Sequence, residues 1–328
     1  MENISIFGPA IFQIVMHIKP FVAFLLIVFA PYRADAQYAD ETRISKHIHR
    51  LASDKMKGRG TGSRELEKAA RYIEKQFRKY NLRPSGTERY RQPFTATVRR
   101  VVVADSMRRA SNVIGFLDNG APHTIVIGAH YDHLGMGRQG GSLDPSPEGK
   151  IHNGADDNAS GVAGLLELAR HFSQNHHIEP YNFLFIAFSA EELGLQGSRY
   201  FIENPTIPLD QLHFMLNMDM IGRYDPDRGI GIGGYGTSSS WPEIFRTVDT
   251  SIKFFTDAAG KGGSDHHVFY MKGIPVLFFH TGGHPDYHAP GDDPAKINYS
   301  ALADIIDLEI QLIKNAMKQD KLQFSATD

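Results

Sequence analysis

Residues 123–133 read HTIVIGAHYDH, an apolar segment that runs directly into histidines and an aspartate. Its length and β-branched residues predict a buried strand. The same arrangement recurs at 183–192 (FLFIAFSAEE), 214–219 (FMLNMD) and 274–288 (IPVLFFHTGGHPDYH). Because side chains at the carboxyl ends of parallel strands gather in one crevice, we expect the four polar clusters to meet.

Helical patterns alternate with these strands. Apolar spacing predicts two helices within 40–82, separated by the glycine-rich break at 58–62, and further helices over 162–173 and 301–317. Strands are also expected at 91–98, 101–104 and 111–117, whereas the glycines between 231 and 236 indicate a loop. Alternating strands and helices predict the α/β class with a covered, largely parallel sheet. No linker or repeat divides the chain, so we expect one catalytic domain over residues 37–328.

Composition limits the chemistry. The chain has 328 residues, a formal net charge of -2, 16 histidines and no cysteine. The absence of a strong basic excess argues against a nucleic-acid partner. Without thiolates, a metal would be held by His, Asp and Glu, a donor set that suits Zn²⁺.

The first 36 residues have the features of an export signal. An apolar run at 21–30 follows Lys19, and Ala34, Asp35 and Ala36 form a small-x-small cleavage pattern. We expect a signal peptide over 1–36, a secreted or periplasmic protein, and no stable membrane insertion after cleavage. An uncleaved amino-terminal membrane anchor is the alternative.

The polar clusters themselves predict a metal site. Carboxylates crowded at one rim raise the cost of ionising one another, and divalent cations remove that cost. A set of carboxylates with histidines and no thiolate is typical of a two-metal hydrolytic site. Residue types and spacing leave open the roles of His133, His266 and His267, and they do not choose among His280, His284 and His288 as a ligand.

Several short segments, in this order along the chain, resemble the M28 zinc aminopeptidases, which are co-catalytic dizinc exopeptidases. They are 51–62 (LASDKMKGRGTG), 129–133 (AHYDH), 154–161 (GADDNASG), 190–198 (AEELGLQGS), 217–222 (NMDMIG), 264–266 (SDH) and 286–288 (DYH). The resemblance covers nearly all of the chain after residue 37. It implies a three-layer α/β/α sandwich of the zinc-exopeptidase type, with a mostly parallel mixed central sheet.

The resemblance also implies a role for each matching residue. Two Zn²⁺ ions per chain would share Asp156, with Glu191 as general base toward the bridging water and Asp132 as a hydrogen-bond partner of a ligand histidine. The bond between Asp156 and Asp157 would be cis. We expect Asp157 itself to be structural support and not a ligand. The implied metal ligands are His130, Asp156, Glu192, Asp219 and His288.

The expected activity is therefore hydrolysis of the amino-terminal peptide bond of peptides with a free amino end. The alternatives are a glutaminyl cyclase-like transferase, which uses one zinc, and a carboxypeptidase or dipeptidase of the same superfamily. A non-catalytic binding protein is disfavoured because every implied ligand and the base are present. Neither the oligomeric state nor the preferred amino-terminal side chain can be inferred from the residues.

Overall fold

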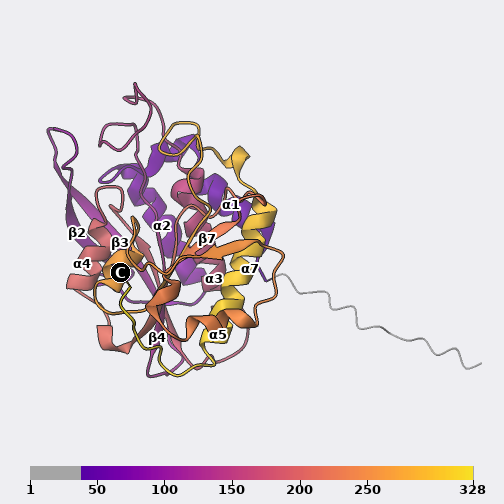
Figure 1. Ribbon diagram of the computed structural model, residues 1–328. Coiled ribbons are helices and arrows are strands. Elements are labelled where there is room, and N and C mark those ends of the chain that lie inside the picture. Colours follow the sequence, from indigo (N-terminus) through magenta and orange to yellow (C-terminus); the bar gives the residue numbers. More distant parts are fainter. Residues whose placement is uncertain (1–37, 328) are drawn as a thin grey trace, which may run out of the picture. The chain divides into compact units, whose positions relative to one another are not determined.

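The apolar segments form the centre of a nine-stranded sheet in the computed structural model, which describes residues 38–327 (Figure 1). The predicted signal peptide lies outside the described residues. The strands are β1 (Arg83–Pro84), β2 (Arg91–Thr97), β3 (Met107–Leu117), β4 (Thr124–His130), β5 (Asn182–Phe188), β6 (Leu212–Met218), β7 (Ile230–Gly233), β8 (Phe254–Thr256) and β9 (Val276–His280).

The strand order is β1-β3-β5-β4-β6-β9-β7-β8, with β2 paired to β3. The four central strands β5, β4, β6 and β9 are parallel, while β3 pairs with β5, and β7 with β9, in the antiparallel direction. The central strands are the four whose carboxyl ends carry the polar clusters. Their parallel direction brings those ends to one edge of the sheet.

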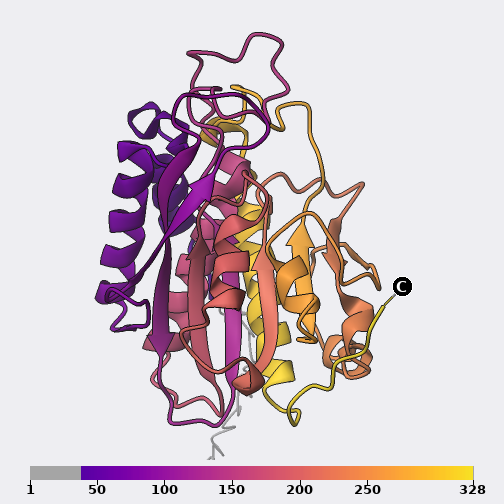
Figure 2. The same ribbon diagram turned by 90° about the vertical axis from the view of Figure 1, so that its left-hand side faces the viewer.

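Helices cover both faces of the sheet, as the expected three-layer class requires (Figure 2). Alternate residues of a strand face opposite ways, so Ile125 and Ile127 of β4 pack in one core and Val126 in the other. The first core includes residues of α1, α2, α3, α5 and α7, and the second includes residues of α4 and α6. The helices are α1 (Glu41–Leu51), α2 (Arg64–Lys79), α3 (Gly161–Gln174), α4 (Gln196–Glu203), α5 (Trp241–Arg246), α6 (His266–Tyr270) and α7 (Tyr299–Ala316).

Side-chain caps explain where three helices begin. Asp40 accepts a hydrogen bond from the backbone N–H of Arg43 at the start of α1, Ser63 caps α2 in the same way, and Asn298 caps α7. Each cap satisfies a donor that has no partner within the helix. None of the helices in residues 38–327 is long and apolar enough to cross a membrane.

Two local predictions were wrong. The apolar run 101–104 forms no strand; it lies in the connection between β2 and β3, where the Val102 side chain is exposed. The segment 230–233, interpreted as part of a glycine-rich loop, forms β7. At Gly231 a Cβ would lie 2.8 Å from Nε2 of His280 on the neighbouring strand, so the glycine permits this close pairing.

Candidate active site

His130 is the last residue of β4, and its buried ring lies among carboxylates. Its Nε2 is 3.2 Å from Oδ1 of Asp219, which follows β6, and 3.3 Å from Oδ1 of Asp157. Its Nδ1 lies 3.2 Å from the backbone carbonyl oxygen of Asp132. When Nδ1 donates to that carbonyl, the Nε2 lone pair faces the two carboxylates. A metal ion between Nε2 and the carboxylates would complete this arrangement, and without a metal a proton on Nε2 serves instead.

The aspartate pair before α3 is turned opposite to the expectation. Asp157, and not Asp156, lies at the centre of the cluster, with its Oδ2 3.1 Å from Nε2 of His288. Asp156 points away and accepts a 2.7 Å hydrogen bond from the backbone N–H of Gly222. The cis peptide bond joins Asp157 to Asn158, one residue later than the resemblance implied.

Hydrogen bonds from two sides fix the backbone around this pair and determine which aspartate faces the cluster. The buried Asp292 carboxylate accepts hydrogen bonds from the backbone N–H groups of Asp156 and Asp157, at 2.9 and 3.0 Å. On the other side, the buried guanidinium of Arg59 donates to the carbonyl oxygens of Asn153, Gly154, Tyr131 and Leu51. Adjacent side chains of an irregular turn point apart, so only the tertiary contacts determine which one faces the cluster.

The two glutamates after β5 also point to different places. Oε2 of Glu192 lies 3.3 Å from Nε2 of His288, and Oε1 of Glu192 lies 2.8 Å from Nδ1 of His133. Oε2 of Glu191 lies 3.9 Å from Nε2 of His130 and lines the adjoining cavity. The two neighbours therefore separate as expected, with one inside the cluster and the other facing the cavity.

Asp132 holds this glutamate turn and does not bind a histidine through its carboxylate. Its Oδ1 accepts a 3.1 Å hydrogen bond from the backbone N–H of Glu191, and its Oδ2 accepts a 3.2 Å bond from the Thr61 hydroxyl. The carboxylate is 3.9 Å from Nδ1 of His130, too far for a hydrogen bond. The expected hydrogen bond to a ligand histidine is made at His130 by the backbone carbonyl of Asp132 instead.

Of the three histidines at and beyond the end of β9, the structure brings His288 to the cluster. Its Nδ1 lies 2.7 Å from the carbonyl oxygen of Gly141, which leaves Nε2 directed at Asp157 and Glu192. His284 lies beside Asp156, 3.2 Å from its Oδ2, and His280 stacks on Phe278. The buried His266 also stacks on Phe278, outside the cluster.

No role in the site was assigned from the sequence to His133, Arg59 or Asp292. His133 is fully buried against Glu192, and its Nε2 has no hydrogen-bond partner within residues 38–327. Arg59 lies in the segment 51–62, which resembles the family, and its position between Gly58 and Gly60 could have marked it as a candidate. Nothing in the sequence distinguishes Asp292 from the adjacent Asp293.

The local charges shift the pKa values of these groups strongly. Burial alone lowers the pKa of a histidine, but the negative charges of Asp219 and Glu191 outweigh burial and hold the pKa of His130 well above its usual range. Burial also lowers the pKa of His288, but hydrogen bonds with Asp157 and Glu192 outweigh burial and raise this pKa to about 11. Burial and the charge of Asp219 raise the pKa of Glu191 well above its usual value, against the opposing charge of His130. The cluster thus attracts positive charge.

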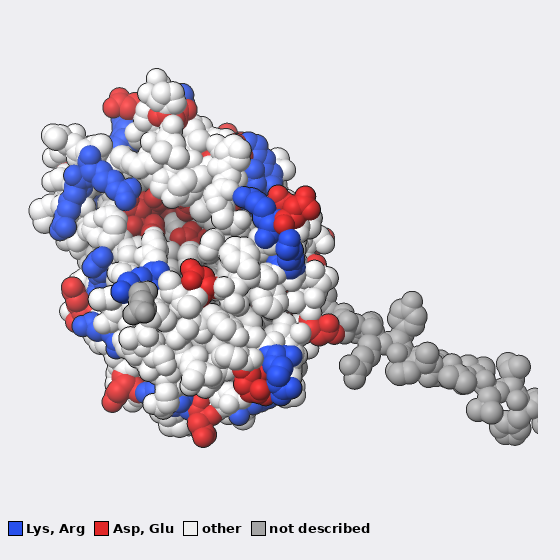
Figure 3. Space-filling model, viewed as in Figure 1, with Lys and Arg blue, Asp and Glu red and all other residues white. Residues whose placement is uncertain are grey.

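Two groups of side chains have the spacing of a metal site: His130, Asp157 and Asp219, and His133, Asp157 and Glu192. In each group one donor atom per residue lies within 4.8 Å of the others. Asp157 belongs to both. Figure 3 shows acidic residues at the bottom of a hollow bordered by basic side chains. The adjoining cavity measures about 260 Å³ and is lined by Glu191, Asp219, Tyr287 and Arg100, among others.

Comparison with known proteins identifies the family. The sequence model of peptidase family M28 matches residues 112–313. Aminopeptidase YwaD of Bacillus subtilis is 30% identical over 210 residues, which are 61% of this chain and 42% of that protein. This chain therefore spans less than half the length of that curated relative.

Two solved structures show the same fold. One is a Zn-dependent exopeptidase from Parabacteroides distasonis, with a TM-score of 0.66 and 17% identity, covering 83% of this chain and 97% of that one. The other is the glutaminyl cyclase of Porphyromonas gingivalis, with a TM-score of 0.66 and 18% identity, covering 84% and 98%.

Proposed function

Because the chain belongs to peptidase family M28, we propose that it is a zinc-dependent aminopeptidase that hydrolyses the first peptide bond of peptides with a free amino end. One observation carries the proposal: two groups of His, Asp and Glu donors, all buried except the half-buried Asp219, share the single carboxylate of Asp157. The 30% sequence identity with an aminopeptidase and the fold shared with a Zn-dependent exopeptidase support the proposal. Export rests on the signal-like sequence of residues 1–36 alone.

The donors fit two zinc ions. His130, Asp157 and Asp219 would hold one ion, and Asp157, Glu192 and His288 the other. These are oxygen and imidazole donors without thiolate, the set found in hydrolytic zinc sites. His130 and His288 each place Nδ1 beside a backbone carbonyl, which leaves Nε2 for the metal. His133 stands as a further donor on the Glu192 side. This assignment replaces Asp156 by Asp157 as the bridging ligand.

When bound, the two ions supply Lewis acidity, lowering the pKa of a water and polarising the scissile carbonyl. The protein supplies the proton carrier. Glu191 lines the cavity and is fixed through its backbone N–H by Asp132. Its carboxylate would accept the proton of the attacking water and donate it to the leaving amine, which departs as a neutral amine.

The structural likeness to a glutaminyl cyclase gives a second candidate. A cyclase would release ammonia from an amino-terminal glutamine and would use one zinc. The shared Asp157 and the complete second donor group favour hydrolysis with two metals. Carboxypeptidase or dipeptidase activity would instead require a free carboxyl end next to the scissile bond.

The test combines metal analysis with a substrate panel. We expect two zinc ions per chain, turnover of amino-acid p-nitroanilides, and no turnover of the same compounds with a blocked amine. One zinc per chain with cyclisation of glutaminyl peptides would replace the proposal by the cyclase.

A matched pair of variants tests the proton carrier. Glu191→Gln removes the carrier and keeps the metal donors, so zinc content should persist while kcat falls by about 10²- to 10⁴-fold. Glu243→Gln, at an exposed glutamate of α5 paired with Arg246, serves as the control and should keep both properties. A near-normal kcat in the Glu191 variant would contradict its assigned role.

A further inference from the structure

A second, larger cavity lies beside the one that holds the carboxylates. It measures about 560 Å³, and its lining includes Phe94, Arg99, Gly194, Arg199, Tyr200 and Glu203. Gly194 lines both cavities, so they adjoin at the turn that follows Glu191 and Glu192. A chain whose first residue lies beside Glu191 and Asp219 can therefore continue past Gly194 into the second cavity.

Side-chain hydrogen bonds fix the wall between the cavities. Gln196 accepts a 2.8 Å bond from the backbone N–H of Thr97 and donates to the carbonyl oxygens of Thr97 and Leu193, each at 2.8 Å. Gln196 thus joins the end of β2 to the turn at Gly194. Arg99 and Arg100 follow two and three residues after Thr97, and Arg99 lines the second cavity while Arg100 lines the first.

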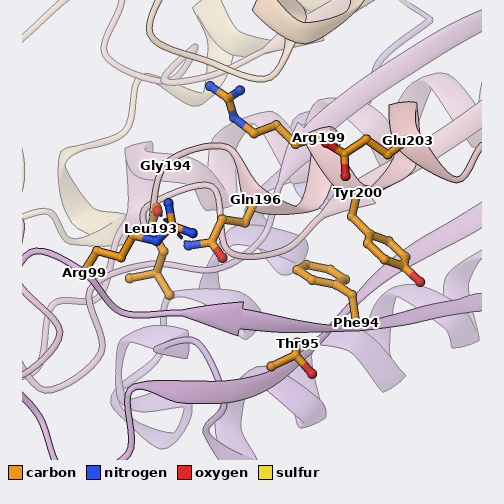
Figure 4. Close-up of a pocket in the computed structure, with 9 residues that line it drawn as sticks. All are labelled: Phe94, Thr95, Arg99, Leu193, Gly194, Gln196, Arg199, Tyr200 and Glu203. Atoms are coloured by element: carbon orange, nitrogen blue, oxygen red, sulfur yellow. Dashed lines mark hydrogen bonds between the residues drawn. The ribbon is translucent and has the colours of Figure 1, made fainter.

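Figure 4 shows the arrangement around the second cavity. Arg99 lies next to Leu193 and Gly194, and Phe94 lies beside Tyr200. The two aromatic rings are stacked, with centroids 5.1 Å apart and planes inclined by 19°. They offer an apolar surface to a peptide, and the arginines offer hydrogen-bond donors.

The three arginines are free to bind an anion. None of the guanidinium groups of Arg99, Arg100 and Arg199 makes an ion pair or a side-chain hydrogen bond within residues 38–327. Glu203 is one turn beyond Arg199 on α4, yet no ion pair joins them. Arginine presents a planar set of donors that matches a carboxylate. The first cavity therefore carries the metal donors, whereas the second is lined by two arginines and one glutamate and has a net positive charge.

We propose that the second cavity binds the part of the peptide that leaves, and that Arg99 and Arg199 there recognise a carboxylate, with Arg100 at the junction. This inference rests on the proposed aminopeptidase function. The carboxylate has two possible sources, the carboxyl end of a short peptide or an acidic side chain two or three residues after the scissile bond. Because the two cavities adjoin at Gly194 and successive residues of an extended peptide advance by about 3.3 Å, tetrapeptides are the substrates chosen for the test.

Four peptides test the proposal with the zinc-loaded enzyme. Leu-Ala-Ala-Ala is compared with its carboxyl-terminal amide, and the amides of Leu-Ala-Glu-Ala and Leu-Ala-Gln-Ala are compared with each other. We expect kcat/KM to be about threefold to tenfold higher for at least one charged member over its neutral partner, the size that a few partly exposed ion pairs supply. The pair that differs identifies the source of the carboxylate. The preference should weaken at about 0.5 M salt, because salt screens exposed charges.

Variants assign the preference to the arginines. In Arg99→Gln combined with Arg199→Gln the ratio of charged to neutral peptide should fall toward one, and in Arg199→Glu the neutral peptide should become the better substrate. Arg246→Gln, at an exposed arginine of α5, is the control and should keep the wild-type ratio. Equal rates for charged and neutral peptides in the wild type, or a ratio that survives the double variant, would overturn the inference. Failure to cleave any of the four peptides would instead refute the aminopeptidase proposal.

Discussion

Glu309 of α7 gives a stability prediction whose size can be worked out. Its side chain is fully buried, and within residues 38–327 neither carboxylate oxygen has a hydrogen-bond partner. Burial raises the pKa of Glu309 well above the ordinary value of 4.5. Because ionising a buried, unpartnered carboxyl is costly, we expect it to stay protonated in the folded protein at neutral pH.

The sign and the magnitude follow from proton linkage. Above pH 4.5 the unfolded chain loses this proton while the folded chain keeps it, so the free energy of unfolding falls as pH rises toward the folded-state pKa. The slope is about 1.4 kcal/mol per pH unit. Between pH 4.5 and pH 7 the loss is at most about 3 kcal/mol, the amount for a folded-state carboxyl that stays protonated throughout. Below pH 4.5 both states are protonated and the effect vanishes.

Glu309→Gln removes the titration and keeps the size of the side chain. Urea unfolding of wild type and variant at several pH values between 4.5 and 7 measures the difference in unfolding free energy. We expect the free energy of unfolding of the variant, relative to that of the wild type, to increase by up to about 3 kcal/mol as pH rises. Glu88→Gln, at an exposed glutamate, controls for the loss of one carboxyl. A difference between the Glu309 variant and wild type that is the same at pH 5 and pH 7 would refute the reasoning.

Two further comparisons test the metal donors. Asp157→Asn should lower zinc affinity by at least about 100-fold, and Asp156→Asn by about tenfold or less, because only Asp157 contacts the histidines of the cluster. Equilibrium dialysis measures both affinities. A larger loss in the Asp156 variant would restore Asp156 as the shared ligand. His288→Ala should reduce the zinc content from two ions toward one, whereas His133→Ala should keep both ions and lower kcat by about 10- to 100-fold through a displaced Glu192. Elemental analysis measures the zinc content of each variant. Loss of an ion only in the His133 variant would show that His133, and not His288, is the ligand.

Much of the fold could be predicted because its signals are local. The apolar runs that end in His130, Glu191 and Asp219 have the length and composition of buried strands, and the structure places them in the parallel centre of the sheet. The run 101–104 has a similar composition but no partner strand, and it stays in an exposed connection. Strand formation depends on pairing across the sheet, which a local pattern does not contain.

The sequence alone determined which residue types meet at one edge of the sheet, since strand direction and the position of each polar cluster are enough for that. Only the tertiary structure decided that Asp157 faces His130 and His288, whereas Asp156 lies beside His284. Two adjacent aspartates are chemically identical, and the choice is made by the backbone turn that Arg59 and Asp292 hold from opposite sides. Those two residues are 233 positions apart in the chain, a contact that no local pattern can predict.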